Sequence, residues 1–369
     1  AKWKVSFQGD KSEEIIFSTK RLESKNPLNL NGDIVKRVDT HKHLGLYLTF
    51  NLDWSVQCHH VCLKAYRKLA VLRSVKLLKR HTLDVLYKIT VRSVLDYSLP
   101  VYFNSLTAKQ KAKLEKIQYT AAKIVSGALH NTSRVSLNEE LAWESIDTRA
   151  QFLGLTIFHK IVKNETRPLI RECLPPRTIH HETLRSEGFR NFPFKGLCFA
   201  NSFFPMFTKK YNLLHAKTRK LNTQDFKAHL LNIMKPKKCK HFSYGHKAEN
   251  MMLTRIRVNC SYLKAHSYKT GHSLTTACPF CPNKTESSLH YLIQCPNFSN
   301  SRKVLFDQIQ QKFIPNFSKL SMKRQFEILV FGYDPYNHEL KQINGKIMML
   351  TQTFISKTKR FSQTKQQFL

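Results

Sequence analysis

The stretch CPFCPNKTESSLHYLIQC, residues 278–295, places three cysteines and one histidine at the spacing Cys-x2-Cys-x8-His-x4-Cys. Cys278 and Cys281 can present two thiolates from one turn, and His290 and Cys295 lie about one helical turn apart, so the four can close a tetrahedron. Three thiolates and an imidazole suit zinc better than calcium or magnesium, and four protein ligands leave no open position for catalysis. The stretch therefore predicts a structural Zn2+ site; the alternative is a chance grouping of buried cysteines.

The surroundings of this stretch are strongly basic, as is the whole chain. The 369 residues contain 61 Lys and Arg against 25 Asp and Glu, a formal net charge of +36. Such a charge costs stability through self-repulsion, and it indicates a polyanionic partner. The sequence contains no apolar run of about 18 residues, the length that would indicate a membrane span. Nine cysteines without a secretory signal argue against a disulfide scaffold and for an intracellular, reducing compartment, nuclear or cytoplasmic.

Three helices are predicted between residues 55 and 126, at residues 55–75, 82–97 and 107–126, from apolar residues at helical spacing. No acidic residue lies between Asp53 and Asp84. Ordinary solvated faces mix charges of both signs, so the cations of the first and third helices are candidates for phosphate contacts, the alternative being a plain solvated surface. These cations are Lys64, Arg67, Lys68, Arg73, Lys76, Lys109, Lys113, Lys116 and Lys123.

The first fifty residues are predicted to be strands. Asn31-Gly32 between apolar residues is a strong hairpin signal, because both turn positions need a positive φ. Further strands are expected at residues 4–7, 12–19 and 44–50. The strand-like start suggests a fragment of a longer protein. Residues 188–248 hold many cations, a single acid and many phenylalanines, most of which are expected to be core.

Several segments resemble LINE-type (non-LTR, jockey-like) retrotransposon reverse transcriptases. Residues 3–18 resemble the segment that follows the Tyr-x-Asp-Asp strand, and His43-Leu44-Gly45 before Leu52-Asp53-Trp54 resembles the primer grip. Residues 87–118 resemble the thumb helices. Residues 253–296 resemble the C-terminal zinc-knuckle region. The likeness covers nearly the whole chain in register.

The resemblance implies an α+β fold in four parts. These are the end of the palm at 1–53, a helical thumb at 54–128, a helical connector at 129–187 that ends near Pro175-Pro176, and a basic C-terminal domain at 188–369 with the zinc knuckle at 278–295. The implied partners are an RNA template and a DNA primer or target DNA, without a membrane.

The resemblance also implies roles for single residues. His43, Leu44 and Gly45 would support the primer terminus, Lys11 would be the lysine of motif D, and Arg255 and Arg257 would contact nucleic acid. The motif departs from the family at Gln8-Gly9-Asp10 and at His43.

Polymerase chemistry would need Mg2+ held by aspartates of the full-length parent. The matching Tyr-x-Asp-Asp is absent from this sequence, so these residues alone are not expected to polymerise. Two alternatives stay open. One is a non-enzymatic zinc-containing nucleic-acid-binding protein derived from such an element, and the other is a basic zinc module that binds acidic proteins.

Overall fold

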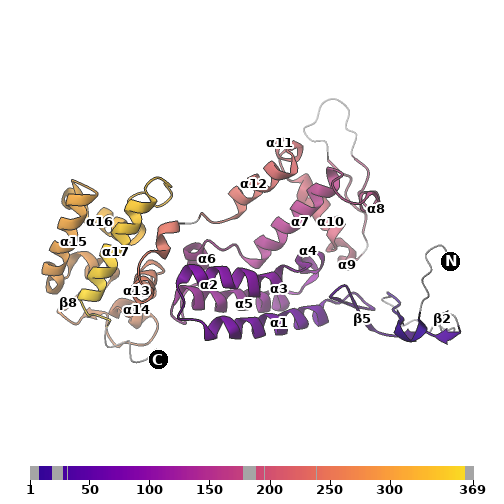
Figure 1. The fold of residues 1–369 in the computed structure, drawn as a ribbon, viewed down its shortest axis with the longest axis horizontal. Helices are drawn as coiled ribbons and strands as arrows, with labels where there is room; N and C mark the ends of the chain where they lie inside the picture. Colours follow the sequence, from indigo (N-terminus) through magenta and orange to yellow (C-terminus); the bar gives the residue numbers. More distant parts are fainter. Residues whose placement is uncertain are drawn as a thin grey trace. The chain divides into compact units, whose positions relative to one another are not determined.

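The computed structural model describes residues 8–18, 28–30, 32–177, 188–194, 196–237 and 239–361. These residues form a mixed α+β structure that is mostly helical and has only short strands (Figure 1). The expected α+β class is confirmed at this level. The strand expected at residues 4–7 lies outside the described residues. Within the described ranges, no helix has both the length and the apolar character that crossing a membrane requires.

The chain divides into two compact units, each built from separate segments. Unit 1 contains residues 1–67, 92–117 and 146–234, and unit 2 contains residues 68–91, 118–145 and 235–369. These units do not follow the four consecutive domains predicted from the sequence. The expected break at Pro175-Pro176 falls inside unit 1, because helices on both sides of it share one core.

The N-terminal strands of unit 1 form three separate pairs, accompanied by the 3-10 turn η1 (Gly9–Lys11). β1 (Glu13–Glu14) runs parallel to β4 (Lys36–Arg37), and β2 (Asn29–Leu30) runs antiparallel to β3 (Asp33–Ile34). The β2–β3 pair confirms the hairpin predicted here, and Gly32 in its turn has a φ of 95°.

The third pair, β5 (Thr40–His43) with β6 (Leu46–Thr49), corrects the strand predicted at 44–50. Leu44 and Gly45 are the two turn residues, with φ values of 45° and 85°. Two consecutive positive φ values match the turn that suits the twist of a tight hairpin. The basic segment His41–His43, for which no strand was predicted, is therefore the partner strand.

The predicted helices at residues 55–126 are confirmed. α1 (Ser55–Ser74) begins after Asp53, whose carboxylate accepts a hydrogen bond from the Ser55 backbone N–H at 3.0 Å. The second expected helix is continuous but changes pitch, and the third is one helix. The elements in order are α2 (Arg80–Tyr87), the π-helix η2 (Lys88–Arg92), α3 (Ser93–Asp96), α4 (Leu99–Tyr102), η3 (Phe103–Ser105) and α5 (Ala108–Ser126).

The remainder of unit 1 packs around α7 (Ile146–Val162). Its core contains Phe158, Phe207 and Phe226, each with no exposed surface or almost none. A Cβ on Gly154 would lie 1.9 Å from the Phe207 ring, so only glycine allows this close approach. The other helices are α8 (Pro168–Glu172), α9 (Leu197–Ala200), α10 (Phe203–Asn212), α11 (Ala216–Lys220) and α12 (Thr223–Met234). Several phenylalanines of residues 188–248 are buried in this core, as expected, whereas Phe194 and Phe199 are exposed.

Unit 2 has a second core that joins the metal-ligand stretch to the C-terminal helices. Tyr291, Ile328 and Met348 are fully buried in it. Its helices are α6 (Arg134–Leu141), η4 (Lys240–Ser243), α13 (Lys247–Arg257), α14 (Lys264–Lys269), α15 (Ser299–Lys312), η7 (Phe317–Lys319), α16 (Met322–Phe331) and α17 (Lys341–Lys357).

Candidate metal centre and basic surfaces

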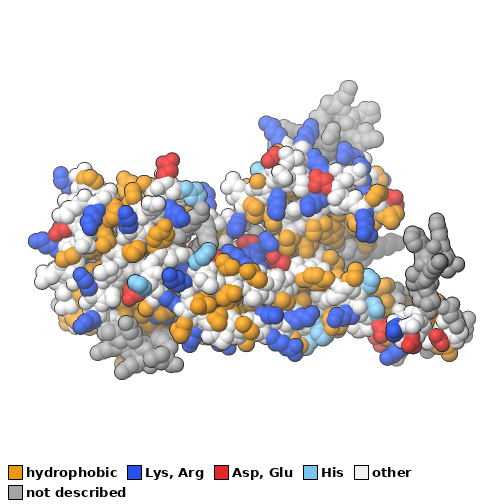
Figure 2. Space-filling model, in the orientation of Figure 1, with side chains coloured by type: hydrophobic (Ala, Val, Ile, Leu, Met, Phe, Trp, Pro, Cys, Tyr) orange, Lys and Arg blue, Asp and Glu red, His pale blue; other side chains and the backbone are white. Residues whose placement is uncertain are grey.

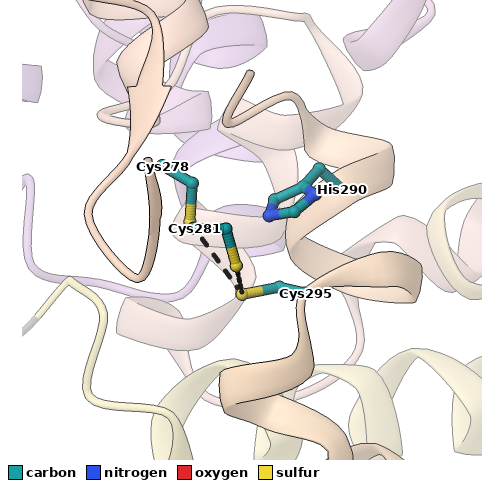
Figure 3. Close-up of side chains that lie close together, drawn as sticks. All are labelled: Cys278, Cys281, His290 and Cys295. Carbon is teal, nitrogen blue, oxygen red and sulfur yellow. Dashed lines mark hydrogen bonds between the residues drawn. The ribbon is translucent and has the colours of Figure 1, made fainter. Parts of the chain in front are cut away.

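Two local structures bring the four predicted ligands together. β7 (Ala277–Cys278) and β8 (Cys281–Thr285) form a hairpin in which Cys278 and Cys281 are paired across the turn. The π-helix η5 (His290–Gln294) carries His290, and the Cys295 N–H donates to the His290 carbonyl at 2.7 Å. This five-residue step is the π-type hydrogen bond, and it brings His290 and Cys295 to one side. Both pairs therefore point into one space (Figure 3).

The distances fit a tetrahedral metal site. The four ligand atoms lie within 4.8 Å of one another. The Sγ of Cys295 is 3.9 Å from that of Cys278 and 3.8 Å from that of Cys281. Zn–S bonds of about 2.3 Å in a tetrahedron separate two sulfurs by about 3.8 Å. The Cys3His cluster can thus hold a metal such as zinc, as predicted from the spacing.

The chemistry of the donors fits the same role. His290 Nε2 is buried and has no hydrogen-bond partner among the described residues, as expected of an atom that faces a metal. Burial lowers the pKa of His290, which favours the neutral imidazole that metals bind. Burial, followed by the neighbouring thiols, raises the pKa of Cys295 to about 12, so a cation is needed to hold the Cys295 sulfur as a thiolate.

Buried polar contacts hold the ligand-bearing backbone in place. Arg302 donates from Nε to the Leu292 carbonyl at 2.9 Å and from Nη2 to the Cys295 carbonyl at 2.7 Å. Phe298, which ends the 3-10 turn η6 (Pro296–Phe298), packs edge-to-face with Phe280 and Tyr291. The hairpin turn and the π-helix are therefore fixed by the same aromatic contacts.

Glu286, between the two ligand pairs, is a structural residue whose contacts the sequence pattern did not reveal. It is 1% exposed and receives two hydrogen bonds from Arg360, at 2.6 and 2.7 Å. Its Oε2 also accepts from the Lys264 N–H at 2.7 Å, at the start of α14. The carboxylate thus joins the metal stretch to α14 and to residue 360.

Most of the residues that were predicted to contact nucleic acid lie on the surface. On α1 and just after it, five are exposed: Lys64, Arg67, Lys68, Arg73 and Lys76. On α5, Lys109, Lys113 and Lys116 are exposed, whereas Lys123 is half-buried with its Nζ 4.4 Å from the Tyr119 ring centre. Figure 2 shows Lys and Arg side chains along the surface that α1 forms, with few acidic side chains among them.

Arg255 and Arg257 require a correction, because they lie in the interior of unit 2. Arg255 is 2% exposed, and its Nε donates to the Gly127 carbonyl at 2.9 Å. The Arg257 side chain is 1% exposed and donates to both carboxylate oxygens of Glu140, at 2.8 and 3.0 Å. Guanidinium groups that are already committed to buried acceptors cannot also meet phosphates in solvent, so both arginines hold the fold.

Glu140 is the centre of a buried ionic cluster that sequence analysis missed. Arg80 and Arg257 both pair with its carboxylate, and Thr254 donates to it at 3.2 Å. Burial alone would raise the pKa of Glu140, but Arg257 and Arg80 together hold it below its usual value. Glu140 is 60 positions from Arg80 and 117 from Arg257 in sequence, so no local spacing could have signalled the cluster.

The expected primer-grip residues lie at the β5–β6 turn in unit 1. The Tyr97 hydroxyl donates to the Leu44 carbonyl, and Gly45 faces the Tyr97 ring. His43 ends β5, and Lys11 is an exposed residue of η1. A cavity of about 300 Å³ beside the turn is lined by Gly45, Tyr47, Gln57, His60, Lys64 and Tyr97.

This cavity has an aromatic wall that the sequence did not predict. The His60 and Tyr47 rings stack in parallel with centres 4.0 Å apart, and Lys42 Nζ lies 5.6 Å from the Tyr47 ring centre. His60 and Tyr47 come from a helix and a strand whose pairing follows only from the tertiary fold.

The nine cysteines, all in described segments, are free. Cys58 and Cys62, four residues apart on α1, are 2% and 8% exposed. Their burial on a packed helix face is typical of free cysteines that act as small apolar side chains, and they lie outside the Cys3His cluster.

Comparison of the chain with protein-family models, with curated protein sequences and with solved structures yields no match. Three features of the molecule bear on its function: the Cys3His cluster, the exposed cations of α1 and α5, and the aromatic cavity at the β5–β6 turn.

Proposed function

We propose that the chain is a nucleic-acid-binding part of a retrotransposon RNA-directed DNA polymerase. In this role α1 and α5 hold the phosphate backbone of template and primer, and the part around a structural zinc contributes contacts to RNA or target DNA. The observation that carries the proposal is the exposed row Lys64, Arg67 and Lys68 on one side of α1.

Electrostatics support this role for α1. Residues three and four apart are neighbours on a helix surface, so these like charges repel one another unless an anion screens them. No acidic residue lies between Asp53 and Asp84, and no ion pair of the three cations is found within the described part of the chain. A row of phosphates supplies the missing negative charge, and its counterions are released on binding.

The cavity at the β5–β6 turn adds a second kind of contact. Its Tyr47 and His60 rings and the nearby Lys64 combine an aromatic surface with a cation. Single-stranded nucleic acids bind to surfaces in which bases stack on aromatic rings while cations hold the backbone. The cavity and the basic side of α1 share Lys64, so one strand could contact both.

The proposed role is binding and positioning, not synthesis by these residues. The sequence has no Tyr-x-Asp-Asp to hold two magnesium ions, and a Cys3His cluster with four protein ligands has no open position for substrate. Zinc would therefore stabilise unit 2, and the resemblance to the thumb and zinc-knuckle segments supports the wider assignment.

A filter-binding experiment tests the proposal. Affinity for RNA and for duplex DNA is measured across a salt series for the wild type and for the triple variant Lys64→Gln, Arg67→Gln, Lys68→Gln. We expect weaker binding to all sequences, with the logarithmic salt slope reduced by about 0.7 to 0.9 for each phosphate that is no longer neutralised.

A second triple variant controls for net charge. Lys312→Gln, Lys319→Gln and Lys323→Gln remove three exposed cations from the region of α15, η7 and α16. We expect a smaller change of slope for this control. Equal slopes for both triple variants would mean that only total charge matters, and an unchanged slope for the α1 variant would contradict the proposal.

A further inference from the structure

Unit 2 contains a second cavity, unrelated to the exposed cations of α1. Its volume is about 590 Å³, which is within the range of about 300 to 1,000 Å³ typical of small-molecule sites. It lies among α6, α13, α16 and the loop that follows α16. The residues on which its chemistry depends are Glu139, Glu140, Lys237, Arg257, Arg324 and Tyr336.

The floor of this cavity is formed in part by the buried ionic cluster around Glu140. The side chains of Arg80, Arg257 and Glu140 are 9%, 1% and 3% exposed, so two guanidinium groups share one carboxylate away from water. On the walls, Arg324 pairs with Glu327 at 3.2 Å, and Lys237 and Glu139 also line the cavity. The lining itself thus contains three cations and three carboxylates, so it can offer both charge-assisted donors and acceptors to a ligand.

The opposite wall is aromatic and accessible. Tyr336 is 57% exposed and Phe331 is 36% exposed, and both line the cavity. Lys237 Nζ lies 5.6 Å from the centre of the Tyr336 ring. A flat apolar group could therefore stack on Tyr336 while an attached anion contacts Lys237. An inorganic anion would leave this aromatic wall uncovered, and a purely apolar ligand would make no use of Lys237 beside it.

The acidic residues of the lining narrow the chemistry further. Glu139 is exposed, and the Glu327 side chain is 38% exposed, so their carboxylates can accept hydrogen bonds from a ligand. Amino and imino groups at the edge of a nucleobase are suitable donors. The lining thus offers an aromatic surface, cations and acceptors, which match the base face, the phosphate and the base edge of a nucleotide.

We propose that this cavity binds one nucleotide, with its base on Tyr336 and its phosphate between Lys237 and Arg324. The inference goes beyond the proposed function, because the α1 side contacts backbone phosphates and reads no base, whereas this cavity would hold an individual base. The nucleotide can be free or can belong to a single strand, since both present the same groups.

Calorimetric titration of the full chain tests the inference. The ligands are AMP, GMP, CMP and UMP, with ribose 5-phosphate and guanosine as fragments that lack the base or the phosphate. We expect each nucleotide that binds to do so more tightly than either fragment. Tyr336→Ala should weaken nucleotide binding by roughly tenfold, the usual scale for removing one stacking ring, and Lys237→Gln should weaken it too. Tyr336→Phe should keep most of the affinity.

Matched controls lie on α14, where Tyr268 and Lys269 are also exposed neighbours. Tyr268→Ala and Lys269→Gln should leave nucleotide affinity unchanged. A trinucleotide that competes with GMP would assign the site to a strand, and failure to compete would assign it to the free nucleotide. The inference is overturned if no nucleotide binds at millimolar concentration, if ribose 5-phosphate binds equally well, or if the Tyr336 and Tyr268 variants behave alike. Salt-dependent binding of long RNA is independent of these outcomes, so a failure of that binding would bear on the α1 side only.

Discussion

Two groups of basic residues in this chain differ in burial and in their hydrogen-bond partners. The arginines at the centre of unit 2 are buried, and their N–H groups donate hydrogen bonds to Glu140, Thr254 and backbone carbonyls. The cations of α1 and α5 are mostly exposed, and α1 has no acidic residue of its own. The same charge therefore stabilises the fold in one place and remains available to a partner in the other. What separates them is whether a carboxylate is buried beside the cation.

The side-chain chemistry fits this division. Arginine has a planar fork of five donors and is weakly hydrated, so it tolerates burial against a carboxylate or a set of carbonyls. Lysine is a strongly hydrated point charge, and it dominates the exposed positions of α5. The metal centre extends the same logic, because a bound cation would be held by four side chains, three of which are buried.

The largest effect should come from removing that cation. We expect one zinc per chain by metal analysis, and we expect Cys281→Ser to lose it and to lower the melting temperature of unit 2 markedly, because structural zinc contributes on the order of 10 kcal/mol. Cys198→Ser, at an exposed cysteine, should keep both zinc and stability. Absence of zinc from protein purified without chelators would contradict the assignment.

The next largest effect should come from Glu140→Gln. The variant leaves two buried guanidinium groups without their carboxylate, which typically costs about 3 to 5 kcal/mol. The neighbouring exposed Glu139→Gln should change the free energy of unfolding by less than about 0.5 kcal/mol. Urea unfolding of both variants measures the difference. Equal stabilities would mean that the buried cluster is not stabilising.

The pH dependence of the free energy of unfolding tests the same buried cluster. The pKa of Glu140 is held below its usual value of 4.5, so the unfolded chain binds its proton more readily. The stabilisation is therefore complete above pH 4.5 and is lost as pH falls through the folded pKa. The gap in unfolding free energy between wild type and Glu140→Gln should shrink as the pH is lowered from about 5 to about 3. If this difference in unfolding free energy stayed constant from about pH 5 to about pH 3, the ion pair of Glu140 would not be its cause.

The smallest effect on stability should come from the α1 triple variant. Because Lys64, Arg67 and Lys68 are exposed, each replacement by Gln should alter the free energy of unfolding by no more than about 0.5 kcal/mol. Arg255→Gln should behave in the opposite way, with reduced stability and an unchanged salt slope for nucleic acid. A triple variant that unfolds readily would mean that these cations are structural after all.

The features that the sequence predicted correctly are local. The four metal ligands lie within 18 residues, and a hairpin and one π turn are enough to bring them together. The hairpin at Gly32 and the start of α1 at Asp53 and Ser55 are likewise decided by neighbours. The error at Leu44 has a local cause too, since a leucine at positive φ gives no turn signal.

What only the tertiary structure decided depends on residues far apart in the chain. Charge and spacing alone determined that the protein is basic, that it has long basic helices and that it can hold a metal. They could not separate Arg257 from Lys64, because the partner of Arg257 is 117 positions away. Nor could they reveal the interleaved units or the cavity beside Tyr336, each assembled from distant segments. The physical reason is that burial and pairing set the role of a charge, and both depend on which distant segments pack together.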